Sequence, residues 1–139
     1  MSGGSTFYLF IFFNSWFNAF MNNTTLLEVN DSLLVVIDIQ PSFVKKESED
    51  GDNSLLQRMC WVINVANWLN VPLVVTAENI PHNGSVASEV EELLPPDTKI
   101  YNRMTFGLTA QADILESVQK TGRKTAVLIG YETDVCITH

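Results

Sequence analysis

The chain has 139 residues, which one domain accounts for, and 46% of them are hydrophobic. Sixteen acidic residues against eight basic ones give a net charge of −8, which argues against nucleic acid or an anionic membrane surface as a partner, since both require a basic patch. The two cysteines, Cys60 and Cys136, form neither a disulfide framework nor a C-x-x-C zinc motif, so we expect reduced thiols in a cytoplasmic protein.

Residues 1–29 differ in composition from the rest of the chain. The apolar run from Phe7 to Phe13 is too short to span a bilayer, which needs about 20 residues. No Lys or Arg precedes Lys45, so the basic start of a signal peptide is missing. We expect an apolar leader outside the fold over 1–29 and the domain over 30–139, with a poor signal sequence or membrane anchor as the alternative for the leader.

The first clear element is a strand that begins at Ser32. Its apolar, β-branched run has no polar alternation, which is typical of a central parallel strand covered on both faces. The run ends in Asp38, and the carboxyl end of such a strand is where open α/β sheets place their active-site groups. From position alone, a turn or helix N-cap aspartate is an equal alternative.

Helix and strand patterns alternate after this strand. Apolar residues three and four apart indicate helices, and short apolar runs indicate strands. Such alternation predicts a parallel sheet with helices on both faces. In chain order, the expected elements are a helix over about 54–70, a strand over 71–76, a helical stretch over 85–94, a strand over 98–103, a helix over 110–120 and a strand over 123–130.

Cofactor signals are weak. Glu78 and His82 lie in one loop, but no third Asp or His stands nearby to complete a metal site. Neither a G-x-G-x-x-G motif nor a phosphate-binding loop occurs, so nucleotide binding has no support. We therefore expect no metal and no cofactor.

The stretch after the last predicted strand carries the most chemistry. The strand ends at Gly130, and Cys136 follows six residues later, where a helix N-terminus would favour the thiolate. A buried structural thiol is the alternative for Cys136. Cys60 lies in an apolar helical stretch and is expected to be an inert core thiol.

Three strands end in reactive groups, which are Asp38, Arg103 and Cys136. The carboxyl ends of parallel strands meet at one edge of a sheet, so these groups can converge. Together they suit a thiolate that attacks a carbonyl carbon, a carboxylate that moves the proton and a cation that stabilises charge.

Three segments resemble a known family. LVVIDIQPSF over 34–43, YNRMTFG over 101–107 and GYETDVCI over 130–137 are similar to the three signatures of the isochorismatase-like hydrolases, the cysteine hydrolase superfamily. The resemblance covers about 30–139 and implies a flavodoxin-like three-layer αβα sandwich with a parallel sheet, usually in a homo-oligomer. It also implies that a small molecule is the substrate.

The same resemblance assigns roles to residues. Asp38 matches the family's general base and Cys136 matches its nucleophile. The bond between Tyr131 and Glu132 matches a non-proline cis peptide that would direct backbone N–H groups of Glu132 and Cys136 into an oxyanion hole. Arg103 stands where the family has its catalytic lysine.

Two departures from the family pattern bear on activity. An arginine supplies positive charge but does not give up its proton, and Lys99, four residues of strand or about 13 Å away, is at the wrong end to replace the family lysine. The chain also ends at His139, where the family continues with the helix that Cys136 would cap, so we expect a domain that is incomplete at its C-terminus.

Three functional hypotheses follow. The first is a hydrolase of the isochorismatase family, or a fragment of one, that acts on a small amide or related C–N bond through a Cys-linked acyl intermediate. The second is a catalytically inactive member or fragment that serves as a binding or oligomerisation module. The third is a flavodoxin-like domain of another family, for which the missing phosphate loop is a difficulty.

Overall fold

The structure is a computed structural model that describes residues 10–13, 27–47 and 53–131. Its strands are β1 (Phe10–Phe13), β2 (Ser32–Ile37), β3 (Leu73–Glu78), β4 (Ile100–Arg103) and β5 (Thr125–Gly130). They form one sheet in the order β1-β5-β2-β3-β4. The pairs β2–β3, β2–β5 and β3–β4 are parallel, and β1 pairs antiparallel with β5.

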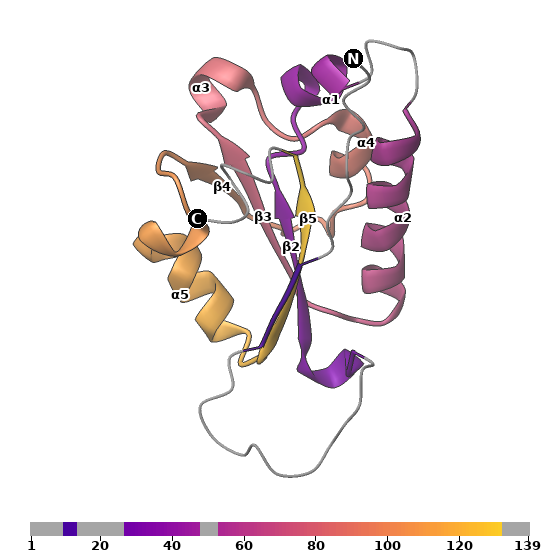
Figure 1. The fold of residues 1–139 in the computed structure, drawn as a ribbon, viewed down its shortest axis with the longest axis vertical. Helices are drawn as coiled ribbons and strands as arrows, with labels where there is room; N and C mark the ends of the chain where they lie inside the picture. The colour runs from indigo at the N-terminus through magenta and orange to yellow at the C-terminus, as the bar shows by residue number, and fades with distance from the viewer. Residues whose placement is uncertain (1–9, 14–26, 48–52, 132–139) are drawn as a thin grey trace.

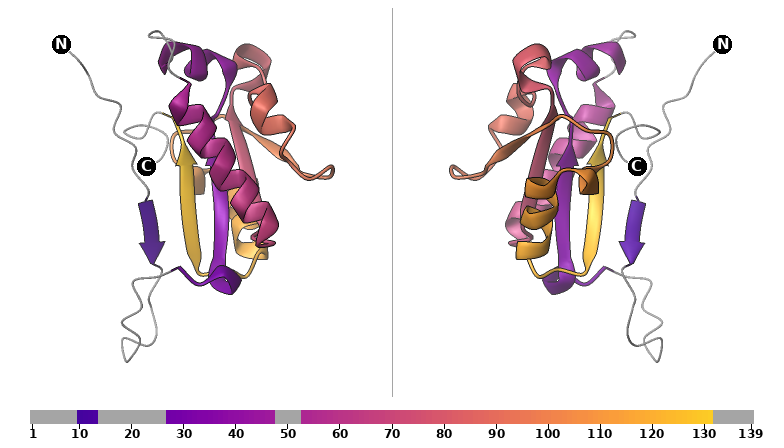
Figure 2. Two further views of the ribbon diagram at one scale, coloured as in Figure 1. Left: turned by 90° about the vertical axis from the view of Figure 1, so that its right-hand side faces the viewer. Right: turned by 90° about the vertical axis from the view of Figure 1, so that its left-hand side faces the viewer.

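Helices cover both faces of this sheet. They are α1 (Pro41–Glu47), α2 (Ser54–Trp68), α3 (Ile80–Asn83), α4 (Ser88–Glu91) and α5 (Ala112–Lys120), with 3-10 turns over Val29–Asp31 and Leu108–Ala110. α2 and α4 pack on one face and α5 packs on the other (Figures 1 and 2). The predicted three-layer, flavodoxin-like sandwich is therefore confirmed. None of the helices in the described ranges is long and apolar enough to cross a membrane.

The central strand β2 explains why the sheet is covered twice. Leu34 and Val36 belong to the core on the α2 side, whereas Leu33 and Val35 belong to the core on the α5 side. All four side chains are buried, and burying each one contributes about 1.5–3 kcal/mol. A strand that is apolar at every position therefore needs a helix layer on each face.

One part of the expected leader, Phe10–Phe13, belongs to the sheet. We expected 1–29 outside the fold, but Phe10–Phe13 pairs with Thr125–Leu128 of β5 as an antiparallel edge strand. An unpaired edge of β5 would expose backbone N–H and C=O groups, and an apolar extended segment satisfies them. The domain boundary at residue 30 otherwise stays a prediction.

Two short helices lie where we predicted no helix. α3 lies in the stretch that we expected to be a loop, the one with Glu78 and His82, and α1 lies in the segment after Asp38, for which we predicted no element. Each begins at or next to a proline, Pro41 in α1 and Pro81 in α3, and proline suits the first turn of a helix because that turn needs no N–H partner.

Candidate active site

Asp38 lies one residue beyond β2, at the carboxyl edge of the sheet, and is only 1% exposed. Its φ of 52° is in the left-handed region, which aspartate tolerates better than most residues. The Asp38 N–H donates to the Thr76 carbonyl at 3.1 Å, and the Gln40 N–H donates to the Asp38 carbonyl at 2.9 Å. This turn leads the chain into α1 and leaves the carboxylate at the sheet edge.

Arg103 is the last residue of β4 and reaches Asp38 across the end of β3. Its Nε donates to Asp38 Oδ2 at 3.0 Å, and a terminal nitrogen donates to the same oxygen at 2.5 Å. The other terminal nitrogen donates to the Thr105 carbonyl. The sequence placed these two residues at one edge, and the structure brings them into direct contact.

Thr76 completes the surroundings of the carboxylate. Its hydroxyl donates to Asp38 Oδ1 at 3.1 Å, so both carboxylate oxygens accept hydrogen bonds. Asp38 and Arg103 are each 1% exposed, and a buried charge without its partner is strongly unfavourable. The arrangement holds an anion and a cation together in a buried site. Sequence reasoning missed Thr76, whose only signal was a hydroxyl residue near the end of a buried strand.

Gln40 fixes the neighbouring backbone and is fully buried. Its Nε2 donates to the carbonyls of Glu78 at 2.9 Å and of Gly84 at 2.6 Å. Its Oε1 accepts the Glu78 N–H at 2.7 Å. One amide thus joins the segment after β2 to the end of β3 and to the end of α3. The sequence showed Gln40 as part of a motif but gave it no role.

Cys136 and Glu132 lie outside the described residues, so their predicted roles are untested. The described chain ends at Tyr131, which is buried and whose N–H donates to the Ile37 carbonyl at 3.4 Å. Gly130 pairs with Ile37, the residue before Asp38. The described chain therefore ends beside the strand that carries Asp38.

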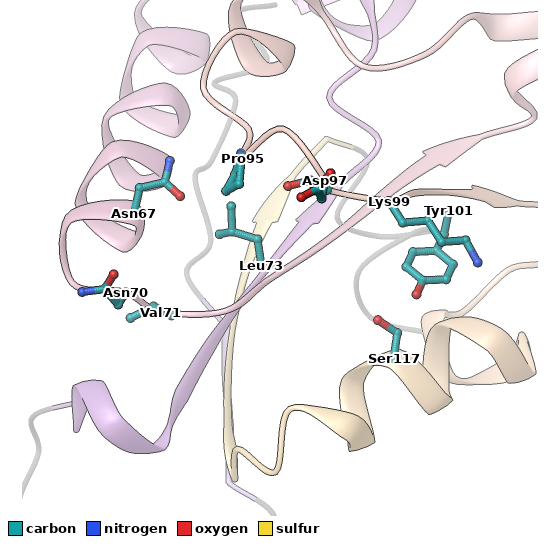
Figure 3. A pocket seen from close by; sticks show the side chains of 10 residues that line it. Asn67, Asn70, Val71, Leu73, Pro95, Asp97, Lys99, Tyr101 and Ser117 are labelled. Carbon is teal, nitrogen blue, oxygen red and sulfur yellow. The ribbon is translucent and has the colours of Figure 1, made fainter.

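Lys99 does not contribute to this site. Its Nζ lies 4.2 Å from the centroid of the Tyr101 ring. Both residues line a groove of about 390 Å³ near the amino ends of β3 and β4 (Figure 3). Asp38 lies at the opposite, carboxyl edge of the sheet. The expectation that Lys99 is at the wrong end of the strand agrees with this placement.

Cys60 lies on α2 and is partly buried, with its Sγ 3.9 Å from the Glu89 carbonyl. Burial raises the pKa of the Cys60 thiol, the Glu89 carboxylate raises it further, and a backbone hydrogen bond lowers it. A raised pKa reduces the thiolate fraction at neutral pH, and the thiolate is the reactive form. We expected an inert core thiol, whereas the structure places Cys60 partly buried against the core; its low reactivity stays a prediction, which the raised pKa supports.

Within the described ranges, His, Cys, Asp and Glu side chains do not gather in groups of three that suit a metal ion. His82 is exposed at the end of α3. Glu78 instead faces Arg103, with 3.9 Å between its Oε2 and an Arg103 nitrogen.

A small cavity of about 100 Å³ opens next to the Asp38–Arg103 pair. It lies between the loop that follows β3 and the loop that follows β4. The residues that line it are Glu78, Asn79, Arg103, Met104, Thr105 and Phe106.

Known proteins match this chain in sequence. A sequence model described as the isochorismatase domain matches residues 32–139. The secreted isochorismatase effector Isc1 of Phytophthora sojae is 34% identical over 116 residues, which are 78% of this chain and 52% of that protein. A probable hydrolase of Escherichia coli, YcaC, is 22% identical over 113 residues, which are 80% of this chain and 54% of that protein. The chain thus spans about half the length of the curated relatives it matches.

Solved structures share the fold. YcaC from Pseudomonas aeruginosa, with hexane-2,5-diol and covalent acrylamide, superposes with a TM-score of 0.71 at 22% identity, covering 84% of this chain and 58% of that one. YcaC from Escherichia coli, described as an octameric hydrolase of unknown specificity, gives 0.72 at 21% identity, covering 84% and 57%. At these identities the likeness shows the fold alone.

Proposed function

Because the chain belongs to the isochorismatase domain family, we propose that it provides the catalytic edge of a cysteine hydrolase that acts on a small amide or related C–N bond. The observation that carries this proposal is the position of Asp38, which is buried, held by Arg103 and next to the point where the chain leaves β5 towards Cys136.

The proposed reaction has two steps. Asp38 takes the proton of the Cys136 thiol, and the thiolate sulfur bonds to the carbonyl carbon of the substrate. The C–N bond breaks, and the nitrogen leaves with the proton that Asp38 returns. Water then attacks the thioester carbon, releases the acid and restores the thiol. In this scheme Arg103 fixes Asp38 and supplies positive charge, since a guanidinium does not transfer its proton.

Selective alkylation tests the nucleophile. Two single-cysteine variants are compared, Cys60→Ser, which keeps Cys136, and Cys136→Ser, which keeps Cys60. At neutral pH we expect iodoacetamide to label Cys136 at least about tenfold faster, because one pKa unit changes the thiolate fraction about tenfold. Equally slow labelling of the two variants would remove Cys136 as the nucleophile.

A second function is favoured by one observation. Both oxygens of Asp38 are already hydrogen-bonded, and its partner is an arginine that keeps its proton. Arg103 and Thr76 thus already occupy both oxygens, which suits a catalytically inactive member that serves as a binding or oligomerisation module. Incubation with a panel of small amides separates the two functions: release of ammonia or amine that depends on Cys136 supports the hydrolase, and its absence across the panel supports the inactive module.

We also propose that the protein forms a homo-oligomer, a proposal supported by the octameric assembly described for YcaC of Escherichia coli. The outer side of α2 exposes Trp61 and Trp68, which lie about two helical turns apart. Sedimentation of the wild type and of the Trp61→Gln, Trp68→Gln double variant tests this surface. A monomeric wild type would contradict the oligomer.

Several expectations stay predictions. They are the small-molecule substrate, the lack of nucleic acid, metal and cofactor, and the cytoplasmic location. For the location, the relative from Phytophthora sojae is described as secreted, which makes secretion the alternative.

A further inference from the structure

The cavity beside Arg103 has an unbalanced charge. Asp38 and Arg103 neutralise each other at close range, whereas Glu78 lies 3.9 Å from the guanidinium and is 32% exposed. With all three groups ionised, their net charge is −1. Glu78 is the one of the three that is exposed to solvent. The net charge of −8 over the whole chain has the same sign and raises the local concentration of cations.

The guanidinium of Arg103 offers little to an anionic ligand. Its Nε and one terminal nitrogen donate to Asp38, and the other terminal nitrogen donates to the Thr105 carbonyl. The side chain is 1% exposed. An anion in the cavity would therefore meet the Glu78 carboxylate before it met an uncommitted donor.

The rim of the cavity adds two apolar groups. Met104 is 62% exposed and Phe106 is 71% exposed, and both line the cavity. An aromatic face attracts a cation by about 0.5–2 kcal/mol, and the polarisable sulfur of methionine tolerates varied partners. A carboxylate and an aromatic ring at one small opening are the groups that recognise alkylammonium ions.

We propose that this cavity is a subsite for a cationic group, an alkylammonium, on the molecule that carries the scissile amide. The inference that the ligand contains an amide rests on the proposed function, whereas the preference for a cation rests on the cavity alone. Glu78 is the specificity-determining residue, because it is the carboxylate that lines the cavity, and its ion pair with Arg103 is long, at 3.9 Å, and shared with Asp38. Phe106 covers the cation and lowers its exposure to water. A neutral apolar group would instead take water away from the Glu78 carboxylate and leave it only the 3.9 Å contact with Arg103, which is unfavourable.

Two isosteric amides test the charge preference. Trimethylglycinamide carries a quaternary ammonium, and 3,3-dimethylbutanamide replaces its nitrogen by carbon. Titrations followed by calorimetry use the full chain with Cys136→Ser, so that no covalent step contributes. We expect the cation to bind at least about tenfold more tightly than the neutral isostere. Equal affinities, or the lack of detectable cation binding, would overturn the proposal.

Variants assign the preference to residues. Glu78→Gln should abolish the difference between the two amides, whereas Glu92→Gln, which removes an exposed charge on the segment after α4, should keep it. Phe106→Leu should reduce the preference severalfold and tests the site even if Glu78→Gln folds poorly, since Phe106 is exposed. A preference that survives in Glu78→Gln, or one that Glu92→Gln also removes, contradicts the assignment.

The binding experiment and the labelling experiment can distinguish failure of the subsite from failure of the proposed reaction. Slow labelling of Cys136 together with a Glu78-dependent preference would leave the subsite on an inactive binding module. Rapid labelling without the preference would leave the hydrolase and remove the subsite.

Discussion

Arg103 and Asp38 stand at the ends of two strands that are not neighbours in the sheet, yet two guanidinium nitrogens bond to one carboxylate oxygen. The contact crosses the end of β3 and therefore ties three strands together at the edge where we place the chemistry. Because both groups are buried, its contribution is best measured by removing one partner.

Replacing Arg103 by Met should destabilise the fold strongly. The change leaves the Asp38 carboxylate buried without a cation, and such losses are about 3–5 kcal/mol. Arg103→Lys should lose less, because an ammonium keeps the charge but not the two-nitrogen geometry. Urea unfolding measures the stability of both variants. The control is Lys120→Met, which removes the exposed Lys120–Glu116 pair and should leave the midpoint unchanged. A wild-type midpoint in Arg103→Met would show that the buried pair does not stabilise the edge.

Replacing Gln40 by Leu should lower the free energy of unfolding by about 2–4 kcal/mol, because the Glu78 N–H and the Gly84 C=O lose the Gln40 amide and the Glu78 C=O keeps only its bond from Asn83. Denaturation with guanidinium chloride measures the loss. Gln119→Leu on the exposed side of α5 is the matched control. If both variants unfold at the same concentration, the Gln40 amide does not hold the two segments together.

Gly130→Ala should destabilise the chain more than Gly122→Ala. A Cβ at Gly130 would lie 2.1 Å from the Ile37 carbonyl oxygen, so β5 would have to move away from β2. At Gly122 the same Cβ meets nothing within 4 Å, and only the left-handed backbone, with φ of 66°, opposes it, by about 1–2 kcal/mol. Thermal unfolding of both variants separates the clash from the backbone strain, and equal shifts would mean that the close approach at Gly130 relaxes freely.

Cys60 should make stability fall at alkaline pH. Burial raises its pKa in the folded state, so the folded chain retains a proton that the unfolded chain loses. Stability from this group is full below the unfolded thiol pKa, about 8.5, and declines as the pH rises above it. Unfolding of the wild type and of Cys60→Ala between about pH 7 and pH 10, a range that brackets this pKa, should show a smaller decline in the variant. Parallel curves would contradict this linkage.

The sequence was most informative where one physical rule dominates. The continuous apolar run of β2 requires cover on both faces, and parallel strands bring Asp38 and Arg103 to one edge, so both features were predictable. The direct contact was not, because the direction of a side chain depends on its rotamer and neighbours. Thr76 decides part of that environment and shows no sequence signal of its own role.

Local structure was harder to predict at the edge itself. The left-handed backbone of Asp38 and the short helices α1 and α3 depend on the Gln40 amide and on turns that join distant segments. The pairing of β1 was missed because an apolar segment of that length fits a leader or an edge strand equally well. Only the unpaired edge of β5 distinguishes the two, and that edge exists only once the sheet has formed.

The β1–β5 pair has a consequence for the order of folding. Phe10 pairs with Leu128, which is the largest sequence separation among the strand pairs of the described sheet. Direct pairing of β1 with β5 closes the longest loop and carries the largest entropy penalty, whereas only residues 14–31 separate β1 from β2 once β2 has paired with β5. We therefore expect β1 to join a preformed parallel sheet. Pulsed hydrogen exchange during refolding should protect the amides of β2 before those of β1, so the strand that comes first in the sequence would be the last to assemble.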